Sequence, residues 1–311
     1  MQPFHFDILT IIGPTASGKT GIATQLTQLV GGVLFGADSR QVYRGMDIGT
    51  GKDLSDFFID GKEVPYEMID ICEAGERYNL HRYLTDFWHA YHALPTEMPK
   101  VLCGGTGLYL EAVLRGYDMP DVPENHALRQ KLYTYTLAEL QAMLDSYSEA
   151  PTVVDRQNSR RLIRAIEVAE YFQQHGEQYE ERTALSGPIF CINIDRQERR
   201  NRISERLRYR LDHGMIEEIE GLLEHLQPEQ LIYYGLEYKY VTEYVMGKLS
   251  RAEMEERLEI AIHQFAKRQM TWWRGMERRG FEIIWVEPEP EYRKSAEKIL
   301  ELTRKWEAQH L

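Results

Sequence analysis

Cysteines are scarce in this sequence, and the three present are too scattered to organise a fold. Cys72, Cys103 and Cys191 are far apart and odd in number, which argues against a disulfide framework and against a tetrahedral zinc site. Each is expected to be a small buried apolar side chain. The fold must therefore rest on a hydrophobic core.

Long hydrophobic runs are also missing. No segment approaches the ~20 consecutive apolar residues that a membrane-spanning helix needs. The first residues, MQPFHFDILTIIG, lack the basic segment and the small-residue cleavage site of a secretory signal. Low-complexity tracts are absent as well. We therefore expect a cytoplasmic protein, folded over most of its length, with no attachment to a membrane.

Positively charged residues are fewer than negatively charged ones: the chain has 37 Lys and Arg and 49 Asp and Glu, so its net charge is −12. This balance argues against a protein that coats nucleic acid uniformly, but it leaves room for a local basic surface. Seven arginines face two acids between Arg196 and Arg210, and further basic clusters lie within 156–164 and 267–279. Each cluster taken alone is equally consistent with a solvated helix face.

The chain has 311 residues, which is long for one simple domain, so we expect a large core that carries an insertion. An apolar run at 8–12 leads through a glycine-rich turn into a helical pattern from Lys19 to about Val30. Further strands are expected at residues 33–35, 67–71, 100–103, 189–194 and 283–286, and core helices at 79–94, 197–226, around 241, 251–278 and 294–308. This alternation predicts βαβ units and a parallel sheet, whose ligands gather beyond the carboxyl ends of the strands.

The pattern changes after Tyr117. The turn-rich MPDVPEN is followed by helical patterns at 127–147 and 159–174, and the chain returns to the sheet with IFCINI. We expect a core made of residues 1–116 and 189–311, with a helical insertion domain at 117–188.

The glycine-rich turn matches the phosphate-binding pattern G-x-x-x-x-G-K-[ST] without an error. Its residues are Gly13, Pro14, Thr15, Ala16, Ser17, Gly18, Lys19 and Thr20. The glycines let the backbone curl so that its N–H groups face phosphate oxygens, and the following helix N-terminus adds positive potential. Lys19 supplies a positive charge, and the Thr20 hydroxyl is suited to hold Mg²⁺. The motif predicts an α/β fold with a P-loop NTPase-like parallel sheet flanked by helices.

The acid that a nucleotide hydrolase usually carries at a strand end is missing from KVLCGG at 100–105, so the loop is expected to hold a different phosphorylated donor. Asp38, at the end of a predicted strand, is suited to general-base work, although a turn cap explains it as well. The glycines around Thr106 permit close approach of a ligand, or simply a tight turn. Asp47 and Lys52 are weaker candidates.

Six ordered segments carry a resemblance to the tRNA dimethylallyltransferase family, also called tRNA isopentenyltransferases. They are GPTASGKT, ADSRQVYRGMDIGTGK, GGTGLY, NSRRLIRAIEV, RISERLRYRLDHGM and AKRQMTWWR. The resemblance spans nearly the whole chain. It implies transfer of a dimethylallyl group from dimethylallyl diphosphate to the N6 amine of the adenosine 3′ of the anticodon, in the anticodon stem-loop of tRNA. It also implies a Mg²⁺ cofactor and a monomeric protein.

By position in these motifs, the P-loop would bind the donor diphosphate and Thr20 would hold Mg²⁺. Asp38 would be the base that faces the N6 amine, and Thr106 would line the tunnel near the target adenosine. Arg202 and Arg206, four residues apart on a helix, would stabilise the departing diphosphate, and the pattern does not rank them. The residues that would lie against tRNA are Asp38, Ser39, Arg40, Gln41, Thr106, Arg160, Arg161, Arg164, Lys267, Arg268, Gln269 and Arg274. Trp272 and Trp273 are suited to stack on bases, but we expect at least one of them in the core.

One segment departs from the family pattern. Where the family usually has Ala-Ile-Gly-Tyr-Lys-Glu, this chain has GLEYKY at 235–240, so no role is carried over to it. Three other functions remain to be tested: prenylation of free adenine nucleotides, phosphorylation of a small metabolite, and RNA binding without catalysis.

Overall fold

The computed structural model describes residues 4–117, 119, 121–148, 154–176 and 183–310. Its contacts divide the chain into two compact units, Met1–Arg115 with Ala184–Leu311, and Gly116–Thr183. The expected insertion, 117–188, extends a few residues further into the first unit. Those residues belong to the sheet side, because the N–H groups of Asp7 and Ile8 both donate to the carbonyl of Ser186 at 3.1 Å.

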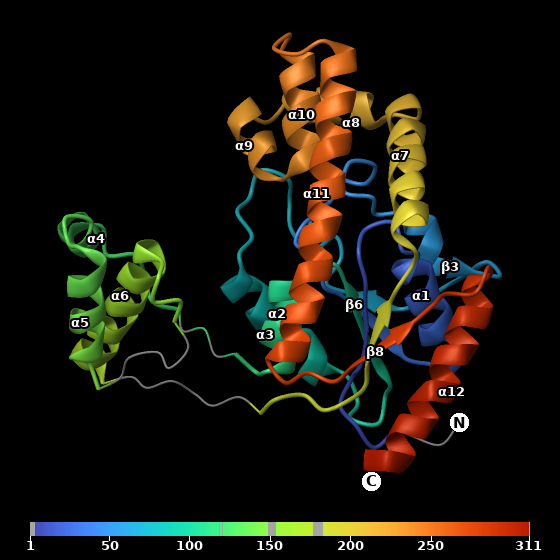
Figure 1. Ribbon diagram of the computed structural model, residues 1–311, viewed down its shortest axis with the longest axis horizontal. Helices are drawn as coiled ribbons and strands as arrows, with labels where there is room; N and C mark the ends of the chain where they lie inside the picture. Colours follow the sequence, from blue (N-terminus) through green and yellow to red (C-terminus); the bar gives the residue numbers. More distant parts are fainter. Residues whose placement is uncertain (1–3, 118, 120, 149–153, 177–182, 311) are drawn as a thin grey trace. The chain divides into compact units, whose positions relative to one another are not determined.

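The first unit is built on a parallel sheet (Figure 1). In the described part of the chain it has six strands in the order β5-β2-β6-β1-β7-β8, and every pairing is parallel. The strands are β1 (Leu9–Ile12), β2 (Val33–Gly36), β5 (Tyr66–Glu67), β6 (Lys100–Gly104), β7 (Ile189–Ile192) and β8 (Ile283–Val286). The α/β fold class with a parallel core is therefore confirmed.

Helices cover both faces of this sheet, as an all-parallel sheet requires. On one face, α1 (Lys19–Val30) and α12 (Tyr292–His310) pack over alternate strand residues such as Leu9 and Ile11. On the other, α2 (Leu80–Ala93) and α3 (Gly107–Leu114) form an aromatic cluster, in which Phe35 lies 5.2 Å from Phe87 between ring centroids. Both faces of β1 and β6 are buried, which explains their largely apolar sequences.

A helical layer follows β7 in the chain. It consists of α7 (Arg196–Asp212), α8 (Met215–Leu223), α9 (Pro228–Tyr233), α10 (Leu236–Val245) and α11 (Arg251–Arg278). The expected single helix at 197–226 is two, because Gly214 has φ +101° and breaks the path between α7 and α8. In Figure 1, α11 runs past the sheet toward the other helices of this layer.

The remaining differences from expectation are local. The strand expected at 67–71 is short, because Met68 and Asp70 adopt positive φ and leave the extended conformation. The sequence patterns missed α3, α9, a short 3₁₀ helix at Leu54–Phe57 and the hairpin of β3 (Phe58–Ile59) with β4 (Lys62–Glu63).

The second unit contains α4 (His126–Leu132), α5 (Leu137–Asp145) and α6 (Ser159–His175) around a small core of leucines. The helix expected at 127–147 is divided because Thr136 forms a capping box that starts α5. Within the described residues of both units, no helix is long and apolar enough to cross a bilayer. The three cysteines are free and buried, as expected.

Candidate functional site

The P-loop lies between β1 and α1, as its sequence predicts. Ala16 and Gly18 both adopt positive φ, +62° and +81°, which curls the backbone just before α1 begins at Lys19. The hydroxyl of Ser17 is buried, and it has no hydrogen-bond partner in the described part of the chain. A Cβ at Gly13 would lie 2.9 Å from that hydroxyl and 3.2 Å from the carbonyl of Ile192. The loop therefore has an unsatisfied polar lining and no room for added side-chain atoms, which suits a bound anion.

Lys19 and Asp38 both lie beside Gly105. A Cβ at this glycine would lie 3.6 Å from Asp38 Oδ2 and 3.6 Å from Lys19 Cε. Burial lowers the pKa of Lys19, while the neighbouring Cys103 and Asp38 oppose that shift. The strands that end at Gly36 and Gly104 are neighbours in the sheet, so topology brings the three segments together, as expected from the sequence.

The backbone after β2 is fixed by Thr106. The N–H of Ser39 donates to Thr106 Oγ1 at 2.9 Å, and the N–H of Thr106 donates to the carbonyl of Ala37 at 3.1 Å. Asp38 Oδ1 accepts from the N–H of Arg40 at 3.1 Å, so the turn interpretation of this aspartate is correct for one of its oxygens. The other oxygen, Oδ2, lies on the side of Gly105 and Lys19.

Gln269 joins the P-loop to the GGTG turn. Its side-chain oxygen accepts from the N–H of Thr15 at 2.8 Å, and its amide donates to the carbonyl of Gly105 at 2.9 Å. The side chain is buried. The resemblance placed Gln269 against tRNA, but in the structure both the oxygen and the nitrogen of its amide form hydrogen bonds within the protein.

Arg206 and Arg202 make different contacts in the structure. Arg206 donates a hydrogen bond to Thr15 Oγ1 in the P-loop. Burial, with Arg210 nearby, lowers its pKa to about 9, so it stays charged at neutral pH. Arg202 instead forms an exposed ion pair with Glu198 at 2.5 Å, one turn earlier on α7. Only Arg206 is therefore seen to contact the loop.

Arg40 is held by the segment that departs from the family pattern. Its Nη1 lies 3.0 Å from Oε2 of the buried Glu237, and its guanidinium lies 5.2 Å from the ring centroid of Phe265. A Cβ at Gly235 would come within 2.3 Å of the Arg40 Cζ, and Gly235 has φ +129°. The segment at 235–240 thus holds the Arg40 side chain in place. The resemblance placed this side chain against tRNA.

Replacing Glu237 by Gln should destabilise the protein by about 1–3 kcal/mol, because it leaves a partly buried guanidinium without its carboxylate. Combined with Arg40→Met, it should cost less than the two changes added, with a coupling of about 0.5–3 kcal/mol. Urea unfolding of the four proteins measures this. The exposed pair of Arg82 and Glu76 is the control, with a coupling below about 1 kcal/mol. If the effects of the two substitutions were additive, Glu237 would not be holding the Arg40 side chain in place.

Glu218 is a site-supporting residue that sequence patterns missed. Its carboxylate accepts from the N–H groups of Asp47, Ile48 and Gly49 at 2.7 to 3.0 Å and from the Tyr238 hydroxyl at 2.7 Å. No spacing signals this, since 170 residues separate Glu218 from Ile48. Lys52 is buried on the same loop, with its Nζ 2.6 Å from Asp47 Oδ1. Asp47 and Lys52 therefore serve the loop's structure.

The residues expected to contact RNA lie on both units. In α6, Arg161 pairs with Asp155 at 2.8 Å, Arg164 donates to the carbonyl of Val122 at 2.7 Å, and Arg160 is exposed. On α11, Lys267, Arg268 and Arg274 are exposed. Of the tryptophans beside them, Trp273 is fully buried and Trp272 is exposed, which confirms that at least one belongs to the core.

The sequence was also compared with known families. Residues 41–276 match the family model described as IPP transferase. The chain belongs to the IPP transferase family. A relative from Azobacteroides pseudotrichonymphae, named tRNA dimethylallyltransferase 1, is 51% identical over 294 residues, covering 92% of this chain and 95% of the relative. Another of the same name, from Parabacteroides distasonis, is 51% identical over 285 residues, covering 91% and 92%.

Solved structures of the IPP transferase family share the fold. The tRNA isopentenylpyrophosphate transferase of Bacillus halodurans matches with a TM-score of 0.69 and 25% identity, covering 97% of each chain. A eukaryotic dimethylallyltransferase acting on tRNA matches with a TM-score of 0.73, covering 94% of this chain and 77% of that one. Its 20% identity supports the fold alone. The family resemblance drawn from the six motifs is confirmed.

Proposed function

We propose that this chain transfers a dimethylallyl group from dimethylallyl diphosphate to N6 of the adenosine 3′ of the anticodon in tRNA. The observation that carries the proposal is the placement of Lys19 and Asp38 on the same side of Gly105. It joins a phosphate cradle to a carboxylate suited to take a proton. Family membership and relatives named tRNA dimethylallyltransferase support the same reaction.

The donor half of the site would act on the leaving group. The C1–O bond of the donor breaks, and its electron pair goes to the diphosphate, so negative charge grows on phosphate oxygens. The curled P-loop backbone, Lys19 and Arg206 place positive charge and N–H donors there before the reaction. These groups stabilise the departing diphosphate more than the intact donor.

A Mg²⁺ ion fits this arrangement. Such ions are held by one or two protein oxygens together with substrate phosphates and water. Among the described residues there is no cluster of three or more acidic, histidine or cysteine ligands, so the ion would depend on the diphosphate. Thr20, in the first turn of α1 after the loop, offers the protein oxygen. When bound, the ion would neutralise part of the diphosphate charge.

The acceptor half of the site would act on the adenine amine. A new bond forms between N6 and C1 of the donor, and the proton lost from N6 goes to Asp38 Oδ2. An aromatic amine is a weak nucleophile, so a nearby base lowers the barrier. The target base must leave its stack to reach a carboxylate between two strand ends. Ser39 and Gln41 follow Asp38 in the same turn and would line the path of the base.

The RNA would be held by exposed cations and one exposed aromatic ring. Lys267, Arg268 and Arg274 on α11, with Trp272 beside them, are placed for backbone contacts and base stacking. On α6, Arg160 is an exposed cation, and Arg161 and Arg164, paired with Asp155 and Glu167, would contact RNA from these ion pairs. A protein that acted on a free nucleotide would have no use for these surfaces.

The molecule that accepts the dimethylallyl group distinguishes this function from the alternatives. With labelled dimethylallyl diphosphate, label should enter an anticodon stem-loop that has adenosine 3′ of the anticodon. It should not enter AMP, nor a stem-loop with guanosine at that position. Label in AMP at a comparable rate would indicate a free-nucleotide prenyltransferase, and ATP-dependent phosphorylation of a small acceptor would indicate a kinase. Either result would overturn the proposal.

A further inference from the structure

A basic cavity lies between α7 and α11, beyond the carboxyl end of β7. Its volume is about 630 Å³, which lies within the range of about 300–1,000 Å³ typical of small-molecule sites. Six of its lining residues are basic or titratable to a cation: Arg196, Arg199, Arg200, His263, Lys267 and Arg274. In a chain with net charge −12, this is an unusual concentration of positive charge.

The four arginines and Lys267 of this lining lack acidic partners in the described part of the chain. Among the described residues, no ion pair is formed by any of the four arginines or by Lys267. Asp195 supplies the lining's one carboxylate within the described chain, and it accepts from the N–H groups of Gln197 and Glu198 at 2.7 and 3.1 Å to cap α7. Burial lowers the pKa of Arg199, and repulsion by Arg196 and Arg274 adds to the shift. Like charges gathered in this way favour an anionic ligand.

His263 adds a further unsatisfied group. It lines the cavity, and its buried Nδ1 has no hydrogen-bond partner in the described part of the chain. Its Nε2 lies 3.5 Å from Glu259. Burial and the neighbouring Arg200 lower the pKa of His263, which favours the neutral ring. A neutral imidazole can donate an N–H to a phosphate oxygen.

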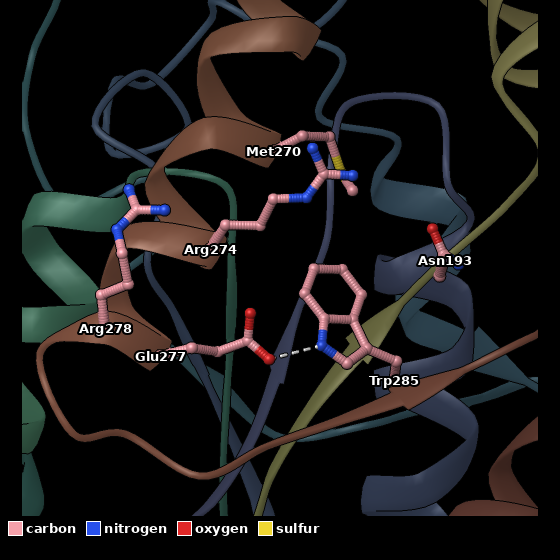
Figure 2. Close-up of a pocket in the computed structure, with 6 residues that line it drawn as sticks. All are labelled: Asn193, Met270, Arg274, Glu277, Arg278 and Trp285. Atoms are coloured by element: carbon pink, nitrogen blue, oxygen red, sulfur yellow. Dashed lines mark hydrogen bonds between the residues drawn. The ribbon is translucent and has the colours of Figure 1, made fainter.

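A second hollow of about 470 Å³ shares Asn193, Met270 and Arg274 with this cavity. Figure 2 shows Arg274 extending toward Met270 and Asn193, while Arg278, which also lines this hollow, lies at the left of the view, away from Asn193. Below Arg274, the Trp285 indole N–H donates to Glu277 at 2.8 Å. Arg274 therefore lies between the two hollows with its guanidinium available to a ligand.

The cavity and the P-loop lie beyond the carboxyl ends of two neighbouring strands, β7 and β1. Asn193 directly follows β7, and β7 pairs with β1, with Cys191 opposite Ile12 at the start of the loop. Ile203 of the lining lies one turn before Arg206, which contacts Thr15. Arg199 is two turns before Arg206, so the two arginines share one face of α7. The same face of α7 therefore carries Arg199 at the cavity and Arg206 at the P-loop.

We propose that this cavity is a second phosphate-binding site, which holds inorganic diphosphate outside the P-loop after transfer. The identity of the anion rests on the proposed function. Arginine is suited to the task because its planar fork matches phosphate oxygens. A site of this kind would draw the product out of a loop that must bind it tightly during catalysis.

Titration of the full-length protein with inorganic diphosphate by calorimetry tests this directly. The wild type should bind two diphosphates per chain, and Arg199→Gln combined with Arg200→Gln should lose the weaker binding event by at least tenfold in Kd. Lys19→Met should weaken the other event. The matched control is Arg208→Gln with Arg257→Gln, which removes the same charge outside the cavity lining and should keep both events.

A single binding event in the wild type, or two events with unchanged Kd in the Arg199 and Arg200 variant, would overturn the proposal. Binding of an anticodon stem-loop is measured in parallel. If the cavity variant loses stem-loop binding while diphosphate binding is unchanged, the cavity is an RNA contact and the proposal fails. Because the titration contains no prenyl donor or acceptor, its outcome is independent of whether the chain prenylates tRNA.

Discussion

Asp38→Asn should lower the single-turnover rate of dimethylallyl transfer by about 10²–10⁴-fold, the usual contribution of a general base. The asparagine side chain keeps an oxygen that can accept from the Arg40 N–H, so the turn after β2 should persist. It cannot take the N6 proton from the side of Gly105. Binding of the anticodon stem-loop, measured by filter retention, should stay near the wild-type value.

The control for Asp38→Asn is Asp86→Asn, the same chemical change on α2, where the carboxylate accepts from the Tyr78 hydroxyl at 2.7 Å. This variant should keep wild-type turnover. If Asp38→Asn turned over within threefold of the wild type, the base would lie elsewhere. If its loss came entirely from weaker stem-loop binding, Asp38 would be an RNA contact and not a base.

Arg206→Gln should lower kcat/KM for dimethylallyl diphosphate by about 10²–10³-fold, the typical loss when one preorganised donor to a developing anion is removed. Arg206 is charged at neutral pH and contacts the P-loop through Thr15. Arg202→Gln is the matched control, one turn away on α7. Its side chain pairs with Glu198 at the surface, so its kinetics should stay within threefold of the wild type.

Steady-state rates at varied donor concentration distinguish the two arginines. Because Arg206 is expected to act on charge that appears during bond cleavage, most of its loss should fall on kcat and less on KM. Equal losses for Arg202→Gln and Arg206→Gln would mean that the exposed Arg202 leaves Glu198 when the donor binds. In that case the contacts seen without ligand would not describe the reacting site.

Local patterns predicted those parts of the fold whose cause is local. The helix α1 begins at Lys19 and ends at Val30 as expected, because glycines with positive φ flank it at both ends. The bounds of α11 follow from the capping box of Ser250 with Glu253 and from the long apolar periodicity after it. The P-loop was identifiable because one continuous segment contains all of its groups.

Tertiary contacts explain what the sequence did not reveal. Gln269 and Glu218 support loops that lie more than 160 residues away in the chain, and no spacing signals such partners. Which of Arg202 and Arg206 contacts the P-loop also depends on which side of α7 faces the sheet. The prediction of a strand at 67–71 was wrong beyond Glu67, because Met68 and Asp70 leave the extended conformation. Residue type alone did not indicate this.

Mass analysis of nucleosides tests dimethylallyl transfer by this chain most directly. A tRNA anticodon stem-loop is incubated with dimethylallyl diphosphate, Mg²⁺ and either the wild type or Asp38→Asn, then digested to nucleosides. We expect N6-dimethylallyladenosine from the position 3′ of the anticodon with the wild type, with one diphosphate released for each modified base. At most a trace is expected with Asp38→Asn. Unmodified adenosine after incubation with the folded wild type would contradict the proposed function.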